Sequence, residues 1–324
     1  MIYLEDNLKI EITGESHSPE ICVRIEGLPK GFEPDLEMAE DMLARRRAGK
    51  LGTTPRVEED KPEIKIEGDA ICAAFKNKNV DSSPYEGDLI PRPGHGDYPY
   101  MAVHGKTIPG GPSSARKTVG LVFAGALCKQ LLAERGIYIN AKVLAIGGVD
   151  AENKEEVEKL LACCKENKDS VGGLVGCTVY GLPVGFGPQN GSKLESGIAK
   201  CVFNLPAVKG LEFGSGFAAA SMFGSENNDP FYFNERGEVK MQTNNAGGVL
   251  GGKACGAPLQ FTVAIKPVPS VGKEQQSVNL TTRQNVTIAL GGRHDICAAL
   301  RAPSLVESAA AIAIANIILG EERK

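Results

Sequence analysis

The sequence lacks the features that would place it in several common classes of protein. Its nine cysteines include no CxxC pair, and an odd, scattered count favours reduced thiols over a disulfide framework or a zinc site. The net charge is only −4, which provides no basic field to attract nucleic acid. We therefore expect neither a bound metal nor a nucleic-acid partner.

Long hydrophobic runs are also absent. The longest, Ala309 to Leu319, contains Asn316 and is too short to span a bilayer. The first residues, MIYLEDNLKIEI, are acidic and alternating, which is unlike a signal peptide. We therefore expect a soluble, cytoplasmic protein without a membrane partner.

Neither of the common nucleotide-binding loops is present. No GxGxxG follows a first strand within a βαβ unit of roughly 30 residues, which counts against a dinucleotide-binding Rossmann domain. The phosphate-binding sequence GxxxxGK[ST] is absent too. Because we find no linker and no short internal repeat, we expect a single domain over residues 1–324.

Hydrophobic periodicity predicts strands and helices that interleave unevenly, as in an α/β or α+β domain. Strands are predicted around residues 8–12, 21–25 and 64–75, at Gly173–Tyr180 and at Ala257–Lys266. Helices are predicted from the Asp35 cap to the Arg45–Arg47 run, and over Ser113–Arg135, Glu155–Glu166 and Pro303–Leu319.

The stretch TNNAGGVLGG, from Thr243 to Gly252, holds four glycines and two asparagines. Such a composition weakens both helices and strands. Either it is a simple connection, or its backbone must let something large lie against it.

Three of the four histidines lie in short polar segments flanked by glycine. They are His17 in GESHS, His95 in RPGHGDY and His294 in GGRHD. A single histidine is more often structural than catalytic. Three in the same setting, each beside another polar group, favour proton transfer, because a neighbouring charge adjusts an imidazole near neutrality.

Two further segments carry groups that suit anions. GGPSSARKT, from Gly110 to Thr118, is typical either of an anion-binding nest that opens a helix or of an ordinary capped helix start. Arg45, Arg46 and Arg47 favour a solvated helix end, although guanidinium groups also bind polyanions. Lys266, in AIKPVPS, follows a buried strand and would ordinarily be solvated.

Taken together and in order, nine segments resemble the chorismate synthase family across nearly the whole chain. The resemblance implies an α+β fold, a single-domain β-α-β sandwich, and a homotetramer. It implies a lyase that eliminates phosphate from 5-enolpyruvylshikimate 3-phosphate to give chorismate, with reduced FMN as cofactor. The segments are GESHS, RRRAG, RPGHGDY, GGPSSAR, PAVKG, TNNAGGVLGG, KPVPS, GRHD and RAPSLVE.

The resemblance also assigns roles to particular residues. His17 and His95 match the histidines that deliver protons, and Asp295 matches the aspartate that assists deprotonation at flavin N5. Arg46 matches an arginine at the substrate or nicotinamide (NADP) end of the site. Gly251 would explain the glycine-rich stretch as part of the flavin site. FMN contacts are implied at Ser113, Ser114, Pro206, Ala207, Gly251, Lys266, Pro267, Val268, Pro269, Ser270 and Arg293.

Several positions depart from the commonest family pattern. Pro112 and Leu121 stand where arginine is usual, Lys117 where glutamate is usual, and Pro206 where asparagine is usual. An alternative is therefore an inactive flavin- or phosphate-binding relative with a regulatory role. Because the proton-transfer residues are retained, an active enzyme is favoured. No additional reductase domain is visible, so we expect an external flavin reductase to supply reduced FMN.

Overall fold

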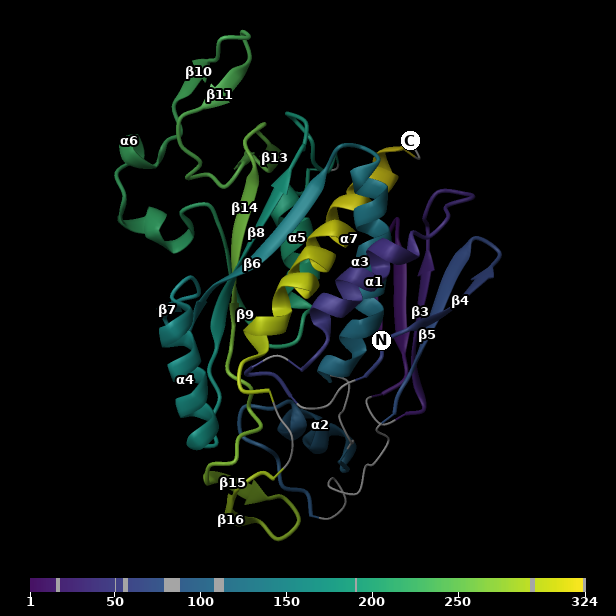
Figure 1. Ribbon diagram of the computed structural model, residues 1–324, viewed down its shortest axis with the longest axis vertical. Helices are drawn as coiled ribbons and strands as arrows, with labels where there is room; N and C mark the ends of the chain where they lie inside the picture. Colours follow the sequence, from purple (N-terminus) through teal and green to yellow (C-terminus); the bar gives the residue numbers. More distant parts are fainter. Residues whose placement is uncertain are drawn as a thin grey trace.

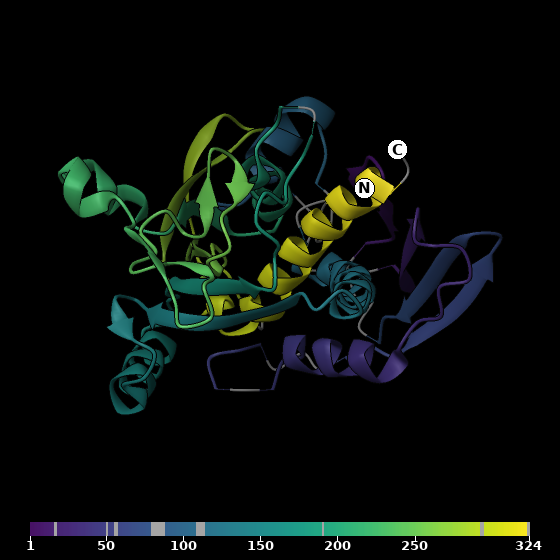
Figure 2. The same ribbon diagram turned by 90° about the horizontal axis from the view of Figure 1, so that it is seen from above.

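Two antiparallel sheets enclose a layer of helices (Figures 1 and 2). The computed structural model describes residues 1–15, 18–49, 51–54, 58–78, 88–107, 114–189, 191–291 and 295–322. In the first sheet the strands lie in the order β1 (Ile2–Glu5), β2 (Lys9–Thr13), β3 (Glu20–Glu26), β5 (Ala70–Lys76) and β4 (Pro62–Glu67). In the second the order is β7 (Val149–Asp150), β6 (Tyr138–Ile146), β8 (Gly173–Tyr180), β14 (Leu259–Ile265) and β9 (Val208–Phe213).

Each sheet buries one face. In β3, Ile21, Val23 and Ile25 are buried while the residues between them are half-buried. Along β8, Val175 and Cys177 point to the core in the same alternating manner. This period of two is what a strand with one apolar face requires.

The helices between the sheets are α1 (Leu36–Arg46), α3 (Thr118–Ala133), α5 (Leu194–Phe203) and α7 (Ala302–Glu322). Helix α3 packs against β3 of the first sheet, and α7 packs against β6 and β8 of the second. Figure 2 shows α7 crossing the layer, with α3 seen nearly end-on beside it. Because α3 and α7 contact protein on all sides, both are hydrophobic around most of their circumference. The predicted β-α-β sandwich and α+β class are confirmed.

Helix α7 and the 3-10 turn before it are long and apolar enough to cross a membrane, the one such helix in the described ranges. Of this hydrophobic window, 89% is buried inside the protein. Its hydropathy is therefore explained by its central position between the sheets.

The remaining elements lie around this sandwich. Helix α4 (Lys154–Glu166) lies beside β7, and α2 (Asp97–His104) lies at the bottom of Figure 1 near one hairpin. The other short elements are η2 (Ala115–Lys117), η3 (Gly216–Ser221), α6 (Gly224–Asn227), η4 (Ala298–Arg301), and the hairpins β10 (Phe231–Phe233) with β11 (Val239–Met241), β12 (Val249–Leu250) with β13 (Lys253–Ala254), and β15 (Gln275–Asn279) with β16 (Gln284–Ile288).

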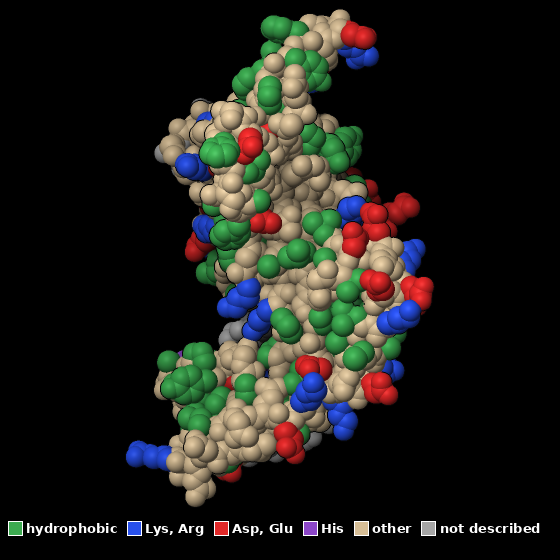
Figure 3. Space-filling model, turned by 90° about the vertical axis from the view of Figure 1, so that its left-hand side faces the viewer, with side chains coloured by type: hydrophobic (Ala, Val, Ile, Leu, Met, Phe, Trp, Pro, Cys, Tyr) green, Lys and Arg blue, Asp and Glu red, His purple; other side chains and the backbone are tan. Residues whose placement is uncertain are grey.

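Residues 214–245 form an arm that projects beyond the second sheet (Figures 1 and 3). It contains η3, α6, β10 and β11, and its surface is unusually aromatic. Phe217, Phe223 and Phe233 are 82%, 78% and 75% exposed. Singly exposed hydrophobic residues are normal, but a group of exposed aromatic rings is typical of a surface that contacts another molecule.

A buried carboxylate ties helices α1, α3 and α7 together. Glu307 of α7 accepts hydrogen bonds from Arg45 of α1 and Lys129 of α3, each at 2.6 Å, and from the amide of Ala141 at 2.9 Å. Burial alone would raise the pKa of Glu307, but the contacts with Arg45 and Lys129 hold this pKa below its ordinary value. The charge of Glu307 is thus compensated in the interior.

Adding a methyl group should destabilise the protein at Gly125 of α3, which contacts α7 closely, but not at Gly197 of α5. A Cβ at Gly125 would lie 2.2 Å from Cβ and 2.5 Å from Cα of Ser308, so Gly125→Ala must push the helices apart. We expect a loss of ~1–3 kcal/mol in the free energy of unfolding. At Gly197 of α5 the nearest atom would be Ile317 Cδ1 at 3.6 Å, an ordinary contact, so Gly197→Ala should gain up to ~1 kcal/mol. Urea unfolding checks both, and equal effects would contradict the packing argument.

Candidate active site

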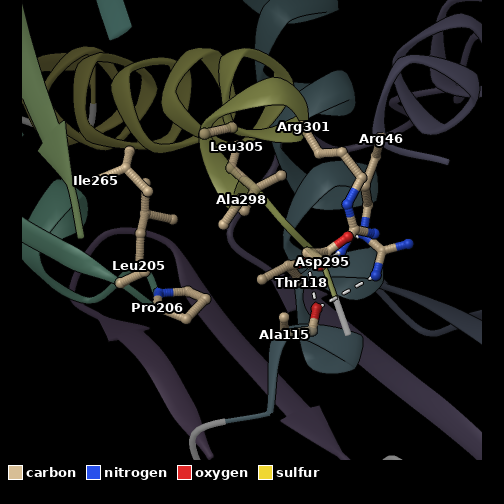
Figure 4. A pocket seen from close by; sticks show the side chains of 12 residues that line it. Arg46, Ala115, Thr118, Leu205, Pro206, Ile265, Asp295, Ala298, Arg301 and Leu305 are labelled. Carbon is tan, nitrogen blue, oxygen red and sulfur yellow. Dashed lines mark hydrogen bonds and ion pairs between the residues drawn. The ribbon is translucent and has the colours of Figure 1, made fainter. Parts of the chain in front are cut away.

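A cavity of about 70 Å³ lies where the chain segments of several predicted motifs meet (Figure 4). Arg46 from the end of α1, Asp295, and Arg301 from the end of η4 lie on one side of it. Pro206 and Leu205 lie on the other. The cavity therefore has a charged wall facing an apolar one.

Arg46 is buried, with 5% of its surface exposed. Its Nε donates to Thr118 Oγ1 at 3.0 Å, and Nη2 contacts the carbonyl oxygens of Ala115 and Arg116, both at 3.3 Å. Burial lowers the pKa of Arg46 to about 10, although Asp60 acts in the opposite direction. The guanidinium is therefore charged at neutral pH and holds the first turn before α3 in place.

Asp60 is the carboxylate that compensates this charge. It is 3% exposed and bridges Arg46 Nη1, at 2.6 Å, and Arg116 Nη1. Its φ of 52° lies in the left-handed region, which aspartate adopts more readily than most residues. Arg116 also donates to Asn77 Oδ1 at 2.7 Å. Asp60 thus joins α1, η2 and the end of β5.

The expectation that Arg45–Arg47 form a solvated helix end is wrong. Each arginine has a carboxylate partner: Glu307 for Arg45, Asp60 for Arg46 and Glu40 for Arg47. The reason is that α1 ends inside the helical layer, where charges must be paired.

Asp295 is held by two groups from different segments. Its Oδ1 accepts a hydrogen bond from the amide of Thr54 at 2.8 Å, and its Oδ2 forms an ion pair with Arg301. Only 13% of the Asp295 side chain is exposed. Nε of Arg301 is buried and has no hydrogen-bond partner within the described residues. Arg301 therefore retains an unsatisfied donor beside Arg46, whose pKa its charge lowers.

His95 lies in a compact ionic cluster. Its Nδ1 is 2.6 Å from Asp97 Oδ1, and Arg92 contacts the same carboxylate through Nε at 2.6 Å and Nη2 at 2.8 Å. Burial alone would raise the pKa of Asp97, but the hydrogen bonds from Arg92 and His95 hold it well below its ordinary value. The carboxylate fixes the orientation of the imidazole, as a catalytic histidine requires.

The loop from Lys266 to Ser270 connects this cluster to the cavity. Lys266 Nζ donates to the carbonyl of Gly94 at 2.6 Å, so this lysine is not simply solvated, and its amide donates to the carbonyl of Ala207 at 2.9 Å. Arg92 Nη1 lies 3.5 Å from Ser270 Oγ. The carbonyl of Val268 accepts a hydrogen bond from Ser170 at 2.6 Å. Five of the implied flavin contacts, Lys266 to Ser270, thus lie between His95 and Ala207.

Ala207 adopts an uncommon backbone conformation, with φ of 67°. This left-handed conformation is strained for alanine and is often found at functional sites. Ala207 and Pro206 both line the cavity beside Asp295. Ser114 caps η2, because its Oγ accepts a hydrogen bond from the amide of Arg116 at 3.3 Å. The capped helix start is therefore confirmed at Ser114.

The glycines of the Thr243–Gly252 stretch have mostly structural reasons. A Cβ at Gly247 would lie 2.4 Å from the amide nitrogen of Gly214, and one at Gly248 would lie 2.5 Å from the carbonyl oxygen of Pro258. At Gly252 it would meet Lys193 at 2.9 Å. Only at Gly251, among these four, is there nothing within 4 Å. Gly251 does not line the cavity that contains Asp295, so its contact with flavin stays a prediction.

Three of the predicted site residues, His17, Ser113 and Arg293, lie outside the described residues, as does His294. Among the residues that are described, no group of His, Cys, Asp and Glu could hold a metal ion.

Comparison with known proteins gives a consistent result. The family described as chorismate synthase matches residues 8–319. A chorismate synthase of Chitinophaga pinensis is 42% identical and covers 97% of this chain and 96% of the relative. The chain belongs to the chorismate synthase family. Another chorismate synthase, from Methanocaldococcus jannaschii, is 35% identical over 97% of this chain and 95% of its own.

A crystal structure of chorismate synthase has the same fold. Its TM-score is 0.74, with 23% sequence identity, over 97% of this chain and 92% of that one. Within this chorismate synthase fold, two residues were not anticipated from the sequence: Arg301, which lines the cavity, and Asp60, which pairs with the lining residue Arg46. Asp60 lies in a charged segment without a motif, and Arg301 stands in the RAPSLVE segment, where a charge directly before a buried helix was the available signal.

The Asp97 cluster predicts a defined dependence of stability on pH. Because the pKa of Asp97 is lower in the folded chain than its unfolded value of about 3.9, the ionised carboxylate stabilises the fold above that pH. This stabilisation is lost as the pH falls through the lower, folded pKa. Asp97→Asn should therefore be less stable than wild type at about pH 6–8, where the carboxylate is fully ionised. The difference in the free energy of unfolding should shrink below about pH 4. Urea unfolding across this range measures it, and a constant difference would refute the assignment.

Proposed function

We propose that this chain is an active chorismate synthase, a lyase that removes phosphate and a proton from 5-enolpyruvylshikimate 3-phosphate to give chorismate. This reaction belongs to the shikimate pathway of aromatic amino acid biosynthesis. The observation that supports the proposal most is the family match over nearly the whole chain, combined with the retained Asp295 beside Arg46 and Arg301 in one cavity.

The charges around this cavity suit an anionic substrate. Arg46, Arg116 and Arg301 are balanced by Asp60 and Asp295, which leaves one positive charge in excess within the described residues. Negative charge accumulates on the phosphate oxygen as its bond to carbon breaks. Fixed cations in a dry cavity stabilise such a charge strongly, because they need no reorganisation. We propose that the positive charge of Arg46 stabilises the departing phosphate at the substrate end of the site, while its hydrogen bonds keep the charged side of the cavity in place.

The residues present fit a bound flavin. Ser114, Pro206 and Ala207 line two adjoining cavities, and the carbonyl of Ala207 accepts a hydrogen bond from the amide of Lys266, so these four implied FMN contacts lie in one region. We propose that these residues and the loop to Ser270 hold FMN. When bound in its reduced form, FMN supplies electron density that helps the phosphate to leave.

We propose that His95 delivers a proton during the reaction and that Asp295 accepts one. Nδ1 of His95 is held by Asp97, and Nε2 lies 3.3 Å from Nη2 of Arg92. We propose that Nε2 carries the proton that His95 delivers to the reaction. Asp295 is the base, and each of its carboxylate oxygens keeps capacity for a proton, since the amide of Thr54 and the guanidinium of Arg301 occupy one position each. Both residues lie outside the regular helices and strands.

An anaerobic assay tests the proposal directly. The chain is mixed with 5-enolpyruvylshikimate 3-phosphate and chemically reduced FMN, and chorismate and phosphate are measured. Equal amounts of both products are expected, with none when FMN is left oxidised. If FMN and substrate bind without product, the chain is the inactive relative instead. Rates with and without an external flavin reductase and NADPH decide whether the chain reduces its own flavin.

Asp295→Asn separates catalysis from binding. If Asp295 is the base, kcat should fall by the ~10²–10⁴-fold typical of lost general-base catalysis. KM should stay equal or fall, because the charge of Arg301 is no longer compensated. The control Asp169→Asn removes a carboxylate from an exposed pair with Lys273 and should leave kcat unchanged. Loss of FMN affinity in proportion to activity would instead assign Asp295 a structural role.

We also propose that the chain assembles as a homotetramer in the cytoplasm. The exposed aromatic residues of the arm support association, since such groups are enriched at the centres of interfaces. Replacing Phe223 and Phe233 together by serine should reduce the molar mass measured by light scattering. An unchanged mass would exclude the arm from the interface.

A further inference from the structure

The connection between α4 and β8, Lys168–Gly172, contacts two parts of the candidate site that lie far apart in the sequence. One is the loop Lys266–Ser270, the flavin loop of the proposed function. The other is the segment that begins with Asp295, the proposed base. None of the residues of the connection lines the cavity with Asp295, and none belongs to the nine segments that carry the family resemblance. Any effect of the connection on the reaction is therefore exerted through the two parts that it contacts.

Ser170 fixes the middle of the flavin loop. Its Oγ donates a hydrogen bond to the carbonyl oxygen of Val268 at 2.6 Å. Val268 stands between Pro267 and Pro269, and a proline has no N–H to donate to a neighbouring strand. Regular strand pairing stops where β14 ends, at Ile265. Beyond that point the hydroxyl of Ser170 supplies a contact that the sheet does not.

Val171, the next residue, fixes the segment of the proposed base. Its amide donates to the carbonyl oxygen of Ile296 at 2.9 Å, and the amide of Ile296 donates to the carbonyl oxygen of Gly52, also at 2.9 Å. Asp295 directly precedes Ile296, and its carboxylate accepts a hydrogen bond from the amide of Thr54. The backbone beside the base is thus held on two sides, one of which is the α4–β8 connection.

The connection also packs closely against both ends of the flavin loop. At the first end, a Cβ on Gly172 would lie 2.5 Å from the carbonyl oxygen of Ile265 and 3.2 Å from the nitrogen of Pro267. At the other end, the amide of Gly272 donates to the carbonyl oxygen of Lys168 at 2.9 Å. These contacts involve only the backbone, so the ends of the loop stay in place when a side chain of the connection is changed.

We propose that Ser170 is a positioning residue, which sets the place of the flavin loop relative to Asp295. The contacts to these two parts come from consecutive residues, so one short stretch of backbone links them. The catalytic consequence rests on the proposed function, because that function puts the cofactor on this loop, whereas the contacts do not depend on it. Removing the hydroxyl would leave the loop folded but free to shift in its middle, and a displacement of about 1 Å can lower a rate by roughly 100-fold.

Ser170→Ala tests this role with three measurements. Hydrogen exchange in the ligand-free chain should become faster over residues 265–273 and stay unchanged in α7. The dissociation constant for oxidised FMN, followed by flavin fluorescence, should rise about 3- to 10-fold, the range for one hydrogen bond. In the anaerobic assay kcat should fall by roughly 10- to 100-fold, with a smaller change in KM for the substrate, because the loop holds the cofactor and not the substrate.

Two variants serve as controls. Ser170→Thr keeps a hydroxyl and should restore the exchange rates, the FMN affinity and kcat toward those of wild type. Asp169→Asn removes the exposed ion pair with Lys273, which joins the connection to the chain after the flavin loop. The asparagine keeps the Oδ1 that accepts a hydrogen bond from the amide of Ser170, so this variant should change none of the three quantities.

The outcomes separate positioning from a merely structural role. Normal FMN affinity and kcat in Ser170→Ala would refute the proposal, whatever the Tm of the variant, because a residue that only supports the fold changes stability alone. A loss that Ser170→Thr does not reduce would also refute it. Faster exchange and weaker FMN binding that Ser170→Thr reverses, in a chain that forms no chorismate, would support the positioning role and refute only the proposed function.

Discussion

The candidate site depends on one buried carboxylate. Asp60 holds the guanidinium groups of Arg46 and Arg116 together, and Arg46 in turn binds the carbonyl oxygens of Ala115 and Arg116. Two like charges would otherwise repel each other in the low dielectric of the interior. Through this bridge the end of α1, the turn before α3 and the end of β5 keep fixed relative positions. The charged wall of the cavity therefore needs no ligand to be assembled.

This arrangement divides the cations of the protein into two groups. One group, which includes Arg45 and Lys129 on Glu307, is compensated and serves the packing of the helices. The other group is represented by Arg301, whose buried Nε has no hydrogen-bond partner within the described residues and which lines the cavity with Asp295. A buried donor without a partner lowers the stability of the fold, and an anion bound in this cavity would satisfy it.

Much of the fold could be predicted from the sequence, because α4 and β8 follow local periodicity and their bounds agree closely with those predicted. The last helix and the Asp35 cap also matched. The pairing of charges could not be predicted, since Arg45 and Glu307 are 262 residues apart and no local pattern records that contact. For the same reason the sequence leaves open whether the glycines at 247 and 248 serve a connection or a bound molecule. In the structure the amide of Gly214 and the carbonyl of Pro258 already exclude side chains there.

The central position of α7 has a consequence for how the chain reaches this structure. Every strand of both sheets precedes α7 in the sequence, yet α7 fills the space between the sheets and carries Glu307 to its partners. During synthesis the two sheets are therefore made without the helix that separates them, and their apolar faces have no native covering until α7 is complete. A nascent chain of this kind is exposed to aggregation, so assembly of the core and of the cavity with Arg301 must wait until α7 has been synthesised.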